Sequence, residues 1–136
     1  MRGFFADHPG VLVGIVLVVL AAAAVVAGKV LADRAATEQT QQRAAEVRRL
    51  LRGATPEDFL AANAGERTSG DVADRVRAEP DFQDVQATAR VGFIRFQPDG
   101  WWAGFTERCV VAEVRAGGVV VRVPKTACVR VGVPED

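Results

Sequence analysis

Residues 10–28 form an apolar run, GVLVGIVLVVLAAAAVVAG, that contains no charged or polar side chain. At about 1.5 Å per residue, a helix of these nineteen residues is long enough to cross the roughly 30 Å hydrocarbon core of a bilayer. Pro9 precedes the run and suits a helix start, because the N–H that proline lacks would be unpaired there. The sequence predicts a transmembrane helix over residues 10–28, preceded by a short tail over residues 1–9.

A cleaved signal peptide is the alternative interpretation of this run. Val25, Val26 and Ala27 stand before Gly28 as a cleavage site of small residues would, and Arg2 supplies a basic start. The apolar part of a signal peptide has only about 7 to 15 residues, however, and this run is longer and is followed directly by a lysine. We therefore favour an uncleaved, single-pass anchor in the cell membrane.

Two signals disagree about the side of the membrane on which the C-terminal part lies. Basic residues follow the run in excess over those before it, which favours a cytoplasmic C-terminal part. The two cysteines of the chain, Cys109 and Cys128, favour an oxidising compartment if they pair. Long C-terminal domains are translocated largely regardless of flanking charge, so we predict an extracytoplasmic domain.

The rest of the chain predicts a helical stalk and one small α+β domain. Residues 29–52 contain no Gly or Pro and continue the helix, with a solvated middle at 37–43 and with Ala44, Val47 and Leu51 spaced for docking. Residues 53–136 form the domain, whose part 53–84 has eight acidic against three basic side chains and two short helices. An antiparallel β-meander of three to four strands is predicted over residues 90–132.

Two hairpins are predicted within the meander. The first places a strand at 91–97, a tight turn at Pro98-Asp99-Gly100 and a return strand that begins at Trp101. The second centres its turn on residues 117–118, which sets Glu113 opposite Arg122. By parity Cys109 and Cys128 then share one face, and we predict a disulfide between them, the alternative being two buried free thiols.

Aromatic and basic residues in the hairpins are the candidate partner surface. Strand alternation sends Trp101 and Trp102 to opposite faces, so one of them is exposed or covered by the stalk or by a partner. An exposed tryptophan beside arginines is typical of protein contacts, and packing under the stalk is the alternative. The candidate partner-binding residues are Trp101, Trp102, Arg95, Arg115 and Arg122.

The composition of the domain argues against catalysis. The only serine is Ser69, and the only histidine, His8, precedes the apolar run, so no Ser–His or Cys–His pair forms in the domain. Two cysteines without a histidine do not make an ordinary zinc site. Basic residues do not cluster with aromatic ones as nucleic-acid binding requires. We therefore expect no enzyme, no metal or other cofactor, and no nucleic-acid partner.

Small residues in the apolar run favour pairing of two such helices. Gly10 and Gly14 form a G-x-x-x-G motif, and Ala21 and Gly28 continue small residues along roughly the same face. A homo-oligomer through the transmembrane helix is therefore one expected assembly.

The order of these elements resembles a type IV pilin-like subunit. In that family a long N-terminal helix leads into an antiparallel sheet, and a disulfide closes the last segment. Gly3-Phe4 matches the processing site of the family, although His8 stands where the family has glutamate. The resemblance implies a filament subunit, which is the alternative hypothesis. The preferred one is a membrane-anchored, non-catalytic domain that binds another protein as an accessory or scaffold subunit of a bacterial envelope complex; abundant Ala, Val, Arg and Gly with two lysines suggest a bacterial source.

Overall fold

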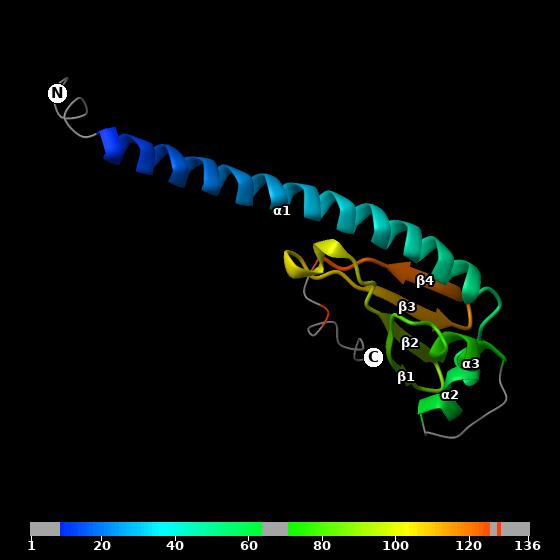
Figure 1. The fold of residues 1–136 in the computed structure, drawn as a ribbon. Coiled ribbons are helices and arrows are strands. Elements are labelled where there is room, and N and C mark those ends of the chain that lie inside the picture. Colours follow the sequence, from blue (N-terminus) through cyan, green and yellow to red (C-terminus); the bar gives the residue numbers. More distant parts are fainter. Residues whose placement is uncertain (1–8, 64–70, 126–127, 129–136) are drawn as a thin grey trace.

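The computed structural model describes residues 9–63, 71–125 and 128. A long helix, α1 (Pro9–Leu50), precedes two short ones, α2 (Glu57–Asn63) and α3 (Asp71–Arg77). The strands β1 (Phe82–Ala87), β2 (Val91–Phe96), β3 (Val110–Arg115) and β4 (Gly118–Arg122) follow, with a short 3₁₀ helix, η1 (Trp101–Gly104), between β2 and β3. The expected α+β class with a long apolar N-terminal helix and a small antiparallel sheet is confirmed (Figure 1).

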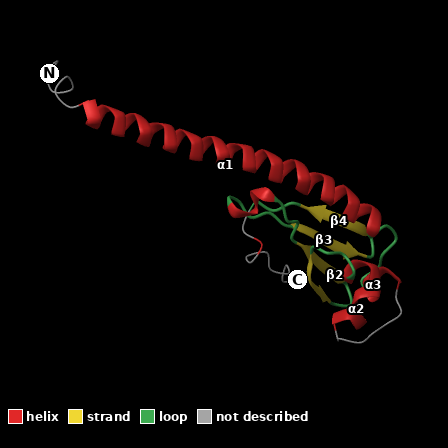
Figure 2. Ribbon diagram, in the orientation of Figure 1, coloured by secondary structure: helices red, strands yellow, loops and turns green. Residues whose placement is uncertain are grey.

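The sheet is a meander whose strands lie in the order β1-β2-β3-β4. The helices pack on one face, which we call the inner face (Figure 2). Its core combines Val47 of α1, Leu51 in the turn after it, Phe59 of α2 and Val76 of α3 with apolar side chains of the sheet. The sheet contributes Ile94, Phe96, Val110, Ala112, Val114 and Val121 to this core. The opposite, outer face carries the other parity of each strand, including Phe93, Arg95, Val111 and Glu113.

Helix α1 passes through two different environments. Its most apolar window of 18 residues has a mean hydropathy of 3.0, and none of that window is buried. Its C-terminal half lies along the sheet (Figure 1) and buries a stripe at spacings of four and finally three residues, formed by Ala32, Ala36, Thr40, Ala44 and Val47. By length and composition the exposed half is sufficient for one membrane span.

The expectation of a solvated stalk at residues 37–43 is wrong for the face that meets the domain. Thr40 is fully buried there, although the segment has no stripe of large apolar residues. Its hydroxyl donates to the carbonyl oxygen of Ala36 at 2.7 Å, so the polar group is satisfied within the helix. Small side chains let α1 approach the domain closely. A contact of this kind produces little hydrophobic pattern in the sequence.

Arg43 holds α1 to the segment between α3 and β1. Its guanidinium donates to both carboxylate oxygens of Asp81, at 2.8 and 2.6 Å, and to Glu79 at 2.5 Å. The same group lies over the ring of Phe96, 5.4 Å from its centroid. Its hydrogen bonds with Asp81, in the first place, and with Glu79 raise the pKa of Arg43 above its usual range. A permanent cation therefore links three elements at the edge of the core.

Local signals at the helix ends are confirmed. Gly53, with φ of +77°, follows the end of α1, as a glycine in the left-handed region does after many helices. The backbone N–H of Thr55 donates to the carboxylate of Asp58 at 2.7 Å, which satisfies the start of α2. The loop from α1 to the domain is consequently short and defined.

The expected strands differ from the structure at two places. β1 begins at Phe82, inside the part that was expected to be helical, and it pairs with β2 through a register shift between Phe82 and Asp84. Trp101 does not open a return strand, because residues 101–104 form η1 and β3 begins only at Val110. Beyond Arg122 the described residues, 123–125 and 128, contain no strand.

The second hairpin forms, but its register differs by two residues from the expected one. Glu113 is opposite Val120, and Arg122 is opposite Val111. Turn residues 116 and 117 close the loop, and Gly118, with φ of +133°, already belongs to β4. Since a shift of two residues preserves the face of every side chain, the expected division into an apolar and a charged face still holds.

We predict that Arg43→Ala destabilises the domain by about 3 kcal/mol, because it leaves two largely buried carboxylates without their cation. Arg43→Lys is expected to recover only part of this loss, since an ammonium lacks the paired donors that meet both oxygens of Asp81. Thermal unfolding of the full-length protein in detergent micelles, followed by near-ultraviolet circular dichroism, measures both. Arg49→Ala, an exposed change on the same helix, is the control; equal stability of Arg43→Ala and this control would contradict the prediction.

Candidate functional site

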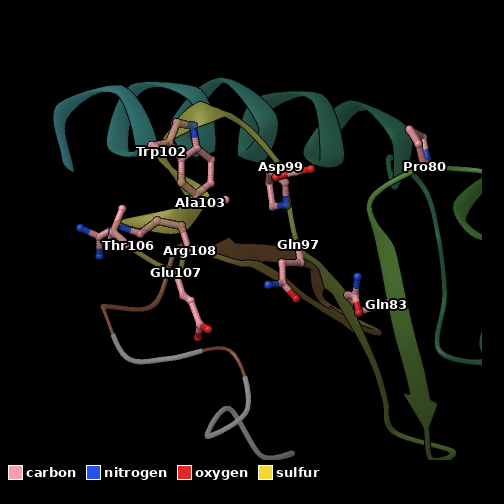
Figure 3. A pocket seen from close by; sticks show the side chains of 10 residues that line it. Pro80, Gln83, Gln97, Asp99, Trp102, Ala103, Thr106, Glu107 and Arg108 are labelled. Atoms are coloured by element: carbon pink, nitrogen blue, oxygen red, sulfur yellow. The ribbon is translucent and has the colours of Figure 1, made fainter. Parts of the chain in front are cut away.

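A polar recess lies beside the corner between β2 and η1. Its volume is about 390 Å³, and Trp102 and Ala103 of η1 form one side, opposite Gln83 and Gln97 near the sheet edge (Figure 3). Asp99 and Glu107 point in different directions in this view, and the Asp99 carboxylate accepts the N–H of Gly100 at 2.8 Å. These two carboxylates do not form the close pair that acid–base chemistry uses. Across the described residues, no group of three His, Cys, Asp or Glu side chains is placed to hold a metal ion.

The two tryptophans lie in very different environments. Trp102 is 1% exposed and packs against Ala32 and Ala36 of α1. Its indole N–H donates to the side-chain oxygen of Gln39 at 2.5 Å. Gly100 is required next to this bond, because a Cβ there would lie 2.5 Å from the indole nitrogen of Trp102. Packing under α1, the alternative raised by the sequence, is therefore the position of Trp102.

Trp101 is 61% exposed at the surface of η1. Its ring meets that of Phe105 edge to face, with 6.4 Å between centroids. Phe105 is itself 53% exposed. We call this pair, Trp101 and Phe105, the aromatic tip; it belongs to η1 and the turn after it, whereas the three candidate arginines belong to the sheet.

On the outer face two of the three candidate arginines share a carboxylate and the third has its own. Arg95 donates to the carboxylate of Asp84 at 2.7 Å and to the carbonyl oxygen of Cys128 at 2.9 Å. Arg115 and Arg122 flank the buried carboxylate of Glu113, at 3.6 and 3.8 Å. Their side chains stay 48% and 64% exposed, so both retain donors that face solvent. The structure therefore brings Arg115 and Arg122 together and places Arg95 and the tryptophans elsewhere.

Cys109 and Cys128 lie together in a small cluster on the outer face, with Phe93 and Val111. Both are buried, and both are free thiols in the structure. Burial, followed by the hydrogen bond with Cys128, raises the pKa of the Cys109 thiol from 9.0 to about 12. The two cysteines lie together, as expected, but strand parity does not place them, because Cys128 lies outside the described strands. The disulfide itself stays a prediction.

The glycines proposed for helix pairing pack against no other part of the chain that the structure describes. A Cβ added at Gly10, Gly14 or Gly28 would meet nothing within 4 Å. Ala21 lies on the same exposed half of α1. Helix pairing through these residues stays a prediction.

Sequence reasoning missed two residues that shape these surfaces. Gln39 fixes Trp102, and Phe105 completes the aromatic tip. Phe105 carries a sequence signal, since it stands four residues after Trp101 in an aromatic-rich segment, whereas Gln39 carries none. The chain matches no protein-family profile, no curated protein and no solved structure.

We predict that Cys109 and Cys128 are joined in protein isolated from membranes without reductant. A bridge that closes a loop of this length contributes about 3 kcal/mol of stability. Alkylation of the denatured protein with and without prior reduction, followed by intact mass, measures the bridge. Full alkylation of both thiols without reductant would exclude it.

The reduced protein offers a control with a defined pH dependence. Because folding raises the pKa of Cys109, the folded state favours the neutral thiol. The resulting contribution to the free energy of unfolding is complete below pH 9 and is lost as the pH rises toward 12. The reduced protein should lose stability across this window. The oxidised protein has no thiol to titrate and should lose less.

Proposed function

We propose that this chain is a single-pass membrane protein in which α1 anchors a small, non-catalytic, extracytoplasmic domain. The domain would bind another protein, as an accessory or scaffold subunit of a bacterial envelope complex. The observation that carries the anchor is that none of the apolar window of α1 is buried, while the C-terminal half of the same helix is docked on the sheet.

The uncovered apolar half supports a lipid environment for this segment. The core helix of a soluble protein would have most of such a window buried, whereas Val18, in the middle of the run, is 68% exposed. Soluble monomers rarely expose contiguous apolar surface larger than a few hundred Å², and these residues are apolar all round the helix. A bilayer is the environment that matches a helix of this kind and length.

The continuity of α1 supports an uncleaved anchor over a signal peptide. The helix runs without a break through Gly28 and Lys29, and its first buried residue, Ala32, is one turn further on. The apolar half is therefore a direct extension of a helix that the domain holds firmly. The adjacent cysteines support an oxidising, extracytoplasmic location, which the alkylation experiment above tests.

The contact surface that we propose for the partner protein lies on the outer face around β4. Val120 is 45% exposed and stands opposite Glu113, between the exposed guanidiniums of Arg115 and Arg122. An apolar centre flanked by arginines is typical of protein interfaces, and its charge suits an acidic partner segment. We call this surface the arginine strip.

A filament subunit of the type IV pilin-like kind is the second candidate. Its support is the arrangement of α1, with one half bare and the other half lying across an antiparallel sheet (Figure 1). The glycine and histidine that bear on its processing, Gly3 and His8, lie outside the described residues. An intact mass that lacks residues 1–3 would favour this candidate over the anchor.

We predict that Val18→Arg abolishes stable membrane residence, because arginine at the centre of a span costs about 3 kcal/mol for insertion. Carbonate extraction of isolated membranes, followed by immunodetection, measures the effect. Val18→Leu is the matched control and should remain in the membrane. Retention of Val18→Arg at the level of this control would contradict the anchor.

We predict that a photo-crosslinking residue in place of Val120 yields one discrete adduct with another protein in intact cells. The same residue in place of Arg90, exposed at the turn between β1 and β2, is the control and should give no such adduct. Arg122→Gln should weaken the adduct, since it removes a charge of the arginine strip while Arg115 still faces the buried carboxylate of Glu113. An equal yield at both positions, or no adduct at Val120, would argue against this surface.

A further inference from the structure

The aromatic tip is an unusual exposed feature of this domain. Outside α1, the exposed large hydrophobic residues among those described are Leu60, Trp101, Phe105 and Val120. Two of these four form the tip, where their rings contact each other edge to face with 70° between the ring planes. The rings therefore present one continuous apolar surface.

The tip is held at the level where the apolar half of α1 ends. Trp102, the neighbour of Trp101, packs on Ala32 and Ala36, so η1 is fixed beside the first docked turns of the helix. The residues of α1 that Trp102 contacts, Ala32, Ala36 and Gln39, lie about 6 to 16 Å beyond Gly28 along the helix axis. Figure 1 shows η1 at the end of the domain that points toward the apolar half of α1.

A second contact fixes the tip on the other side. Arg108, which follows Phe105 by three residues, is largely buried, and its Nη2 lies 3.9 Å from Oδ1 of Asp33 on α1. The segment that carries the two exposed rings is thus attached to α1 both before and after them. Its distance from the end of the apolar run is set by the fold and does not depend on a flexible loop.

We propose that Trp101 and Phe105 insert into the headgroup region of the bilayer that α1 crosses. This inference rests on the proposed membrane anchor. Polar headgroup layers add roughly 5 to 8 Å on each side of the hydrocarbon core, so the first docked turn of α1, at Ala32 beside η1, lies in this zone when residues 10–28 span the core. Tryptophan is enriched at this depth because its ring is apolar and its N–H is polar. Lys29 and Arg34 lie on α1 at the same level and suit phosphate groups.

The tip gives the domain a second attachment to the membrane. A span alone fixes a domain near the surface but leaves its tilt free, whereas a span and an adjacent aromatic contact define which side of the domain meets the lipid. The arginine strip, on the outer face of the sheet, is then held in a fixed orientation to the bilayer.

Fluorescence quenching of the full-length protein in phosphatidylcholine vesicles tests the depth of Trp101. Lipids with brominated acyl chains should remove most of the Trp101 emission, which is obtained as the difference between the wild type and Trp101→Phe. Trp102 is enclosed by the protein and should contribute an emission that changes little. In Trp101→Phe/Val120→Trp, the matched control, the new tryptophan lies on the outer face and should be quenched by aqueous iodide and not by bromolipid.

A photo-crosslinking residue in place of Phe105 identifies the occupant directly. A phospholipid adduct is expected. An adduct with another protein, an adduct with a second copy of this chain, or quenching of Trp101 by iodide alone would each overturn the inference. Carbonate extraction of the same samples separates the two proposals: loss of the protein from the membrane contradicts the anchor, while retention with a water-exposed Trp101 contradicts only the tip.

Discussion

The structure depends on the close contact between the C-terminal half of α1 and the sheet. That contact is made by side chains no larger than Ala and Thr over three turns, followed by Val47 and Leu51 in the main core. Small residues bury little area each, so the attachment also relies on the Trp102–Gln39 hydrogen bond and on Arg43, which lie one turn apart in the middle of the docked segment. Without this contact the inner face would be uncovered at β3 and β4, and the helix would have no defined direction relative to the domain.

Much of the fold could be predicted from local signals in the sequence. The apolar run, the glycine after α1, the capped start of α2 and the β3–β4 hairpin each depend on neighbouring residues, and each is present in the structure. The register of that hairpin was wrong by two residues because two adjacent glycines allow more than one turn, and only the backbone conformation of Gly118 distinguishes them.

The features that sequence reasoning missed depend on contacts between distant segments. The segment after Gly100 was expected to form a strand, but burial of the Trp102 ring under Ala32 and Ala36 requires a tight 3₁₀ turn instead. The docked face of residues 37–43 was not apparent because alanine and threonine do not stand out in a hydrophobic pattern. For the candidate site, the expected exposure of one tryptophan holds for Trp101. Its premise, strand alternation, does not hold, because both tryptophans belong to η1 and Trp102 lies under α1 and not in the core of the sheet.

Rigid coupling has a mechanical consequence for whatever binds the domain. Between Lys29 and Leu50 the helix contains no glycine or proline, and contacts at Ala32, Arg43 and Val47 fix it to the sheet along its length. The apolar half and the domain therefore turn as one body. A rotation of α1 about its axis, or a tilt of that axis, therefore turns the guanidiniums of β3 and β4 through the same angle. A change in the orientation of the helix is thus converted into a displacement at the surface of the domain.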